Sequence, residues 1–125
     1  NKQILKNSTL RLFEGSGGFE NGDQKRDFVF VDDVVKINLW FMKKNISGIF
    51  NVGTGRPNSF NIVGKNIIHW HNKGKIKYIS FPKKLRNTYQ HYTKANIKNL
   101  RKIGYNYKFT NIKKGIDCYL NHLNS

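Results

Sequence analysis

Arg26 is the side chain in this sequence best suited to bind a ligand, and it opens the run of residues 26–35. Its planar guanidinium presents a rigid fork of N–H donors that fits a phosphate or a carboxylate. The same group could instead form a surface ion pair with Asp27 or Glu14, which would contribute little stability. The residue types alone leave both interpretations open.

A strand followed by a helix is expected to hold Arg26 in place. Residues 28–31 combine the aromatic and β-branched side chains that are typical of a buried strand. Asp32 or Asp33 then fits a helix N-terminus, where a carboxylate accepts hydrogen bonds from free N–H groups and opposes the positive end of the dipole. Apolar residues recur at helical spacing over 33–44. The pattern predicts a strand–helix corner to which the rest of the chain returns.

The remaining chain predicts the alternating strands and helices of an α/β fold. Residues 49–52 form a near-continuous apolar run between two glycines, as expected of a buried parallel strand. Ser59 is a suitable N-cap for the helix that follows it. We expect further strands over 9–14 and 76–81, and helices over 60–72, 94–103 and 111–123.

The net charge of the chain suggests an anionic partner, but the rest of the composition does not favour one. A formal net charge of +16 and a pI near 10.1 are typical of proteins that bind nucleic acid or an anionic membrane. Lysine, however, is scattered along the sequence and is abundant together with neutral Asn and Ile. We therefore favour a solvated basic surface and expect no nucleic-acid or membrane partner. A basic nucleic-acid-binding module remains the alternative from a different class.

Cysteine and histidine usage indicates neither a disulfide nor a metal site. Cys118 is the only cysteine, which excludes an internal disulfide and fits a reducing compartment, so we expect a cytoplasmic protein. No run approaches the roughly 20 apolar residues that a membrane span needs. His69 and His71 stand two residues apart on a predicted helix and point to different sides, without a cluster of further ligands. No metal is expected.

Several motifs resemble those of nucleotide-sugar enzymes among the extended short-chain dehydrogenases/reductases. Two of them are Arg-Asp-Phe-Val-Phe-Val-Asp-Asp-Val from residue 26 and Gly-Ile-Phe-Asn-Val-Gly-Thr-Gly from residue 48. Leu-Phe-Glu-Gly-Ser at 12–16, Phe-Pro-Lys-Lys-Leu at 81–85 and Tyr-Gln at 89–90 narrow the resemblance to the ADP-L-glycero-D-manno-heptose 6-epimerase family. The resemblance implies that residues 1–125 are the C-terminal substrate-binding part of an extended Rossmann-type nucleotide-sugar epimerase. Residues 49–52 would then belong to the Rossmann sheet of the complete enzyme.

The resemblance also implies a set of substrate-binding residues: Phe13, Glu14, Gly15, Ser16, Arg26 and Tyr89. Without it, the glycine-rich segment 15–22 would be interpreted as a flexible connection. Tyr89 has a second interpretation, as an aromatic residue that fills the surface of the domain. The segment 17–24 is longer than in some members of the family, which leaves its path open.

The chemistry of the resembled family needs groups that this sequence does not contain. The family interconverts ADP-D-glycero-D-manno-heptose and ADP-L-glycero-D-manno-heptose at C6 with tightly held NADP, supplies heptose for the lipopolysaccharide inner core, and forms homo-oligomers. It uses a glycine-rich βα turn for the pyrophosphate and a Tyr-x-x-x-Lys pair for proton transfer. Here Thr93 stands four residues after Tyr89, and Phe109 four after Tyr105.

We therefore expect no catalytic or cofactor-binding residue in these 125 positions, with NADP bound by a missing N-terminal half. The sequence does not begin with Met, and we expect it to be a partial product. On its own it should hold no NADP, epimerise nothing, and be marginally stable or prone to aggregate. Another epimerase or dehydratase of the same superfamily is the alternative substrate assignment.

Overall fold

Strands and helices alternate along the chain, as the sequence predicts for an α/β fold. The computed structural model describes residues 1–85 and 88–125. Its elements are α1 (Lys2–Asn7), β1 (Thr9–Phe13), β2 (Lys25–Arg26), α2 (Val31–Met42), β3 (Asn58–Ser59), α3 (Phe60–His71), β4 (Lys75–Ile79), a single 3₁₀ turn η1 (Lys83–Leu85), α4 (Lys98–Lys102) and α5 (Ile112–Asn124).

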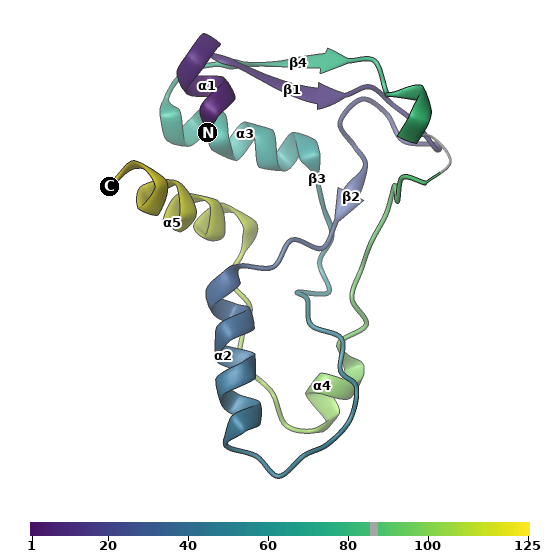
Figure 1. Ribbon diagram of the computed structural model, residues 1–125, viewed down its shortest axis with the longest axis vertical. Helices are drawn as coiled ribbons and strands as arrows, with labels where there is room; N and C mark the ends of the chain where they lie inside the picture. The colour runs from purple at the N-terminus through teal and green to yellow at the C-terminus, as the bar shows by residue number, and fades with distance from the viewer. Residues whose placement is uncertain (86–87) are drawn as a thin grey trace.

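The pair β1 and β4 forms one end of an elongated molecule (Figure 1). The strands are parallel, with Thr9 opposite Lys75 and Phe13 opposite Ile79. Helix α3 lies against them, and α5 packs beside α3. Gly64 allows the close approach, because a Cβ at this position would lie 2.9 Å from Cδ2 of Leu10. The strands predicted over 9–14 and 76–81 are both confirmed, with slightly shifted ends.

Helices α2 and α4 form the other end of the molecule, below the short pair β2 and β3 in Figure 1. Ile37 of α2, Leu100 of α4 and Tyr105 are almost completely buried against one another. Trp40 packs edge-on against Tyr105, with ring centroids 5.4 Å apart. This apolar cluster fixes the position of α2 and hence of the residues that precede α2.

The start of α2 differs from the sequence prediction. The N-cap is Phe30, whose side chain forms no capping bond, and the helix begins two residues earlier than expected. Neither Asp32 nor Asp33 is the N-cap. The buried carboxylate of Asp33 instead accepts hydrogen bonds from the backbone N–H of Thr110 at 2.6 Å and from its hydroxyl at 3.1 Å. Asp33 thus connects α2 to the segment before α5.

The strand predicted over 28–31 is wrong in its position. The paired residues are Lys25 and Arg26, and residues 27–30 carry no strand assignment. Phe28 packs edge-on against Phe60, with centroids 5.6 Å apart, so side-chain packing rather than a ladder of backbone bonds holds this segment.

Residues 49–52 also carry no strand assignment in the part of the chain that is described. Ile49 is 96% exposed and Val52 is 37% exposed. A strand needs a hydrogen-bonded neighbour, and no described segment pairs with these residues. The expected strand is therefore absent here, and its membership of a Rossmann sheet stays a prediction.

The helices at 60–72 and 111–123 are confirmed within a residue or two. The Ser59 hydroxyl accepts a hydrogen bond from the N–H of Ile62 at 3.3 Å, as its predicted role as N-cap requires. Helix α4 is shorter than the predicted 94–103. The N–H of Ala95 is bound to Asp27 and the N–H of Lys98 to the side chain of Asn96, which keeps residues 94–97 out of the helix. Among the described residues, no helix is long and apolar enough to cross a membrane.

Candidate functional site

Arg26 lies at the end of β2 with its guanidinium over the ring of Tyr89. The guanidinium carbon is 5.0 Å from the ring centroid, a cation–π distance. One of its terminal nitrogens donates to the Lys25 carbonyl at 3.0 Å. The two ion pairs found among the described residues involve neither Arg26 nor Glu14. Within residues 1–85 and 88–125, the remaining donors of the fork have no hydrogen-bond partner and can bind an anion.

Aromatic packing fixes Tyr89 beside Arg26. The Tyr89 ring meets Phe81 edge-on at 5.0 Å and Phe13 edge-on at 6.4 Å. Phe81 is only 5% exposed, so it forms a rigid base under the other two rings. A cavity of about 160 Å³ opens beside them and is lined by Arg11, Leu12, Phe13, Gln24, Phe60 and Tyr89.

The segment after β1 brings the other predicted residues to the same end of the sheet. Glu14 continues from β1, its N–H donating to the Ile79 carbonyl at 2.9 Å. The N–H of Gly15 donates to the side-chain oxygen of Asn21 at 2.7 Å. Ser16 follows, with its hydroxyl oxygen 3.1 Å from Nε2 of His91.

The structure therefore gathers residues that are far apart in the sequence. Phe13 and Arg26 both contact Tyr89, and Ser16 is joined to this group through His91. Glu14 and Gly15 are exposed on the same segment. Contact of these residues with a substrate stays a prediction, but their proximity is a property of the fold.

Asp27 organises the backbone around Arg26, a role that sequence reasoning missed. Its carboxylate accepts hydrogen bonds from the hydroxyl and N–H of Thr54, from the N–H of Gly55 at 2.8 Å, and from the N–H of Ala95 at 3.0 Å. A Cβ on Gly53 would lie 2.9 Å from Oδ2 of Asp27, so the turn requires glycine there. In the sequence, an ion pair with Arg26 was one of the interpretations left open for Asp27.

These bonds also determine the acidity of Asp27. Burial by itself raises the pKa of the carboxyl group, because it penalises the charged form. The hydrogen bonds from the Thr54 hydroxyl and the backbone N–H groups of Ala95, Thr54 and Gly55 outweigh that effect and lower the pKa below its ordinary value of 3.8. The carboxylate is thus charged at neutral pH and fully engaged in holding the turn.

Two further residues near the site were not singled out from the sequence. Gln24 is 1% exposed, and its side-chain amide donates to the Glu14 carbonyl at 2.9 Å. His91 stacks on Phe81, with centroids 5.9 Å apart and ring planes 24° apart. No local sequence signal marks either residue, because their partners lie on other segments.

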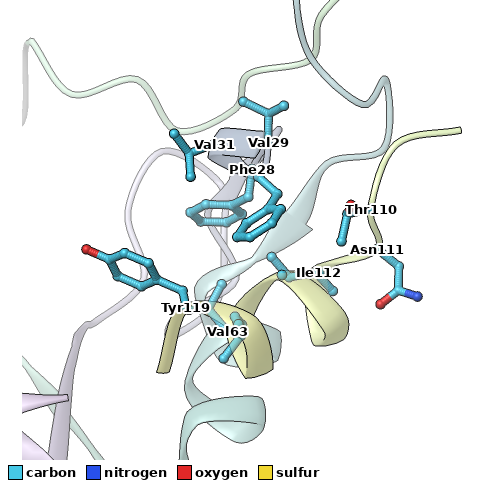
Figure 2. A pocket seen from close by; sticks show the side chains of 11 residues that line it. Phe28, Val29, Val31, Val63, Thr110, Asn111, Ile112 and Tyr119 are labelled. Atoms are coloured by element: carbon cyan, nitrogen blue, oxygen red, sulfur yellow. The ribbon is translucent and has the colours of Figure 1, made fainter. Parts of the chain in front are cut away.

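A separate apolar cavity lies between α2, α3 and α5 and is shown in Figure 2. Its volume is about 490 Å³. Phe28 and Val31 line it from the segment leading into α2, Val63 from α3, and Ile112 and Tyr119 from α5. No charged side chain lines it, so it offers nothing to hold a diphosphate.

The described residues do not fit a dinucleotide or a metal ion. A dinucleotide pyrophosphate binds where a glycine-rich turn leads from a strand into a helix N-terminus. Here the glycine-rich segment after β1 leads into β2. Within residues 1–85 and 88–125, no three His, Cys, Asp or Glu side chains are grouped to bind a metal.

Comparison with known proteins shows which proteins this chain is similar to. Residues 2–53 match the profile of a family described as the NAD dependent epimerase/dehydratase family. The chain is similar to ADP-L-glycero-D-manno-heptose-6-epimerase from Helicobacter pylori, with a TM-score of 0.78 and 28% identity over 98% of this chain. It is also similar to the Thermotoga maritima UDP-glucose 4-epimerase solved with UDP-glucose, with a TM-score of 0.76 and 23% identity over 98% of this chain.

A third solved structure is UDP-N-acetylglucosamine 4-epimerase from Methanobrevibacter ruminantium in complex with UDP-N-acetylmuramic acid, with a TM-score of 0.72 and 20% identity over 97% of this chain. The chain spans 35% of the Helicobacter protein and 37% of each of the other two. Its fold is that of part of an extended Rossmann-type epimerase, which confirms the predicted fold class.

Proposed function

We propose that this chain is the substrate-binding part of an ADP-L-glycero-D-manno-heptose 6-epimerase, and that Arg26 binds the diphosphate of the nucleotide-sugar. The observation that carries the proposal is the Arg26–Tyr89 contact, 5.0 Å from guanidinium carbon to ring centroid, beside Phe13 and the segment 14–16. The motifs at 12–16, 26–34, 81–85 and 89–90 and the 28% identity to the Helicobacter protein support the choice of heptose.

Each residue has a chemical role in this proposal. Arg26 offers a bidentate fork to the phosphate oxygens, and the ring of Tyr89 keeps that fork in a fixed orientation. Phe13 provides an apolar surface next to the ring. The segment of Glu14, Gly15 and Ser16 is exposed or half-exposed, so its backbone and hydroxyl can reach a ligand.

The hydride chemistry belongs to NADP, which the proposed enzyme would hold with residues outside this chain. When bound, the cofactor removes and returns a hydride at C6 of the heptose. The residues described here bind and orient the substrate. We further propose a cytoplasmic homo-oligomer, in keeping with the lone Cys118 and with the resembled family.

Substitution of Arg26 tests the proposed function directly. Arg26→Lys keeps the positive charge but loses the bidentate geometry. In the intact protein, meaning the complete enzyme of which this chain is proposed to be a part, it should weaken ADP-heptose binding by about 1–3 kcal/mol. This is the scale of a charge-assisted hydrogen bond. Isothermal titration calorimetry measures the change. Arg101→Lys is a matched control, since Arg101 also lies over aromatic rings, those of Tyr105 and Phe109, but on α4 at the other end of the molecule, and should leave the affinity unchanged.

Two outcomes would contradict the proposal. If Arg26→Lys binds ADP-heptose as tightly as the wild type, Arg26 is a surface residue without a role in ligand binding. If the wild type prefers UDP-glucose over ADP-heptose, the second candidate applies, namely another nucleotide-sugar epimerase or dehydratase. The match of residues 2–53 to the NAD dependent epimerase/dehydratase family supports that second candidate.

A further inference from the structure

The glycine-rich segment 15–22 is held at its base by contacts that do not involve the proposed site. Asn61, at the start of α3, donates from its backbone N–H to the Gly22 carbonyl at 2.9 Å. Its side-chain amide donates to the Asn21 carbonyl at 2.7 Å and to the Asp23 carboxylate at 2.8 Å. These bonds fix the end of the segment that enters β2. The tip, residues 16–19, is closed on itself by a hydrogen bond from the N–H of Phe19 to the Ser16 carbonyl at 3.2 Å, and needs further contacts to join it to the rest of the fold.

His91 provides the contacts at the tip. Its ring is stacked parallel to that of Phe19, with centroids 6.3 Å apart and planes 6° apart, and is also stacked with that of Phe81. Its Nε2 lies 3.1 Å from the hydroxyl oxygen of Ser16. A single side chain thus joins both ends of the tip to the buried base of the aromatic cluster.

Gly17 shows independently that the tip is fitted to the His91 ring. Its φ is +61°, a conformation that favours glycine. A Cβ at this position would lie 2.7 Å from three atoms of the imidazole. The backbone of the tip therefore lies directly against the ring, at a separation that no larger residue permits.

The backbone and neighbours of His91 connect the tip to both proposed ligand contacts. The His91 carbonyl accepts a hydrogen bond from the N–H of Lys25 at 2.9 Å, one residue before Arg26. Its ring meets that of Tyr89 edge-on at 5.3 Å. Because of these contacts, a displacement of His91 would also displace Ser16, Arg26 and Tyr89.

We propose that His91 is a positioning residue that orders the tip of the glycine-rich segment and holds Ser16 beside the Arg26–Tyr89 pair, which raises the affinity for a nucleotide-sugar. The proposal rests on the proposed function for the identity of the ligand. The ordering of the tip does not depend on it, because every contact involved joins residues of this chain.

Hydrogen exchange of the intact, unliganded protein tests the ordering. His91→Ala should speed amide exchange at residues 16–19 by about tenfold, the equivalent of one lost hydrogen bond and ring contact. Exchange at Gly22 and Asp23 should stay unchanged, because their N–H groups donate to the carbonyls of Phe13 and Glu20, each at 3.0 Å. Gly17→Ala displaces the same ring without removing it and should have the same effect. His122→Ala on α5 is the matched control and should change neither region.

Ligand titration of the same variants tests the positioning. His91→Ala should raise the Kd for ADP-heptose, and KM with it, by about tenfold while kcat stays unchanged. His91→Gln, which retains a polar group toward Ser16, should recover part of the loss. Unchanged exchange at 16–19 in both His91→Ala and Gly17→Ala would overturn the proposal, and so would faster exchange with unaltered affinity. A wild type that binds no nucleotide-sugar would overturn the proposed function, while the exchange data would still decide the role of His91.

Discussion

Asp27 makes the strongest residue-scale prediction, because its carboxylate accepts hydrogen bonds from three backbone N–H groups on two segments, 54–55 and 95. Asp27→Asn removes the charge and places an NH₂ group where N–H donors point. The free energy of unfolding should fall by about 1–2 kcal/mol at neutral pH, a value reduced for the partial exposure of the group. Urea unfolding measures it, and Asp32→Asn, an exposed neighbour in α2, should change little.

The pH dependence of that difference follows from the lowered pKa. A carboxyl group whose pKa is lower in the folded state contributes stability above its ordinary value of 3.8, and this contribution is lost as the pH falls through the folded-state pKa. The difference between wild type and Asp27→Asn should therefore be constant near neutrality and shrink in strong acid. A difference that grows as the pH falls would contradict the assignment.

For individual residues, the sequence predicts which side chains lie at the site better than it predicts which contacts they make. Arg26, Tyr89 and Phe13 are recognisable from their motifs, and the fold brings them together. The partners of Asp27 and His91 are not recognisable, because the bonds span 28 and 75 residues of sequence. Such contacts depend on the tertiary fold and leave no local pattern.

The elements of the chain vary in how strongly local sequence determines them. Helix α3 begins at Ser59 because a hydroxyl there accepts the N–H of Ile62. The segments 28–31 and 49–52 have strand-like composition but lack a hydrogen-bonded neighbour among the described residues, so composition alone mispredicts them. A strand forms only where a second segment supplies its hydrogen-bond partners, whereas a capped helix forms its hydrogen bonds within one segment.

The cap gives an element-scale prediction. Ser59→Ala removes the side-chain acceptor at the start of α3 and should lower the free energy of unfolding by about 1 kcal/mol. Thermal or urea unfolding measures the loss. Ser80→Ala, at an exposed position after β4, removes the same hydroxyl without a cap and should be close to neutral. Equal effects of the two changes would show that the cap contributes nothing.

At the scale of the whole molecule, α2 is apolar on two sides. Ile37 faces the buried cluster with Leu100, while Val31, Val35, Leu39 and Met42 are 58%, 48%, 51% and 80% exposed at helical spacing. A continuous apolar face of this kind promotes association when it is left in water. Aggregation of the isolated chain stays a prediction, and this face gives a structural reason for it.

Charge on that face should reduce the association. Leu39→Lys combined with Met42→Lys places two charges on the exposed side of α2, away from Ile37, and should shift the isolated chain toward the monomer in analytical ultracentrifugation. Asn45→Lys combined with Asn106→Lys adds the same two charges at exposed polar positions outside the stripe, and controls for the change of charge alone. An unaltered distribution of species would mean that another surface drives the association.

The most direct test of the account is a competition between two nucleotide-sugars for the intact protein, measured by isothermal titration calorimetry with ADP-L-glycero-D-manno-heptose and with UDP-glucose. ADP-heptose should bind at least about tenfold more tightly, a difference of roughly 1.4 kcal/mol. Arg26→Lys should weaken that binding. Equal affinity for the two sugars, or tighter binding of UDP-glucose, would contradict the assignment of this chain to heptose recognition.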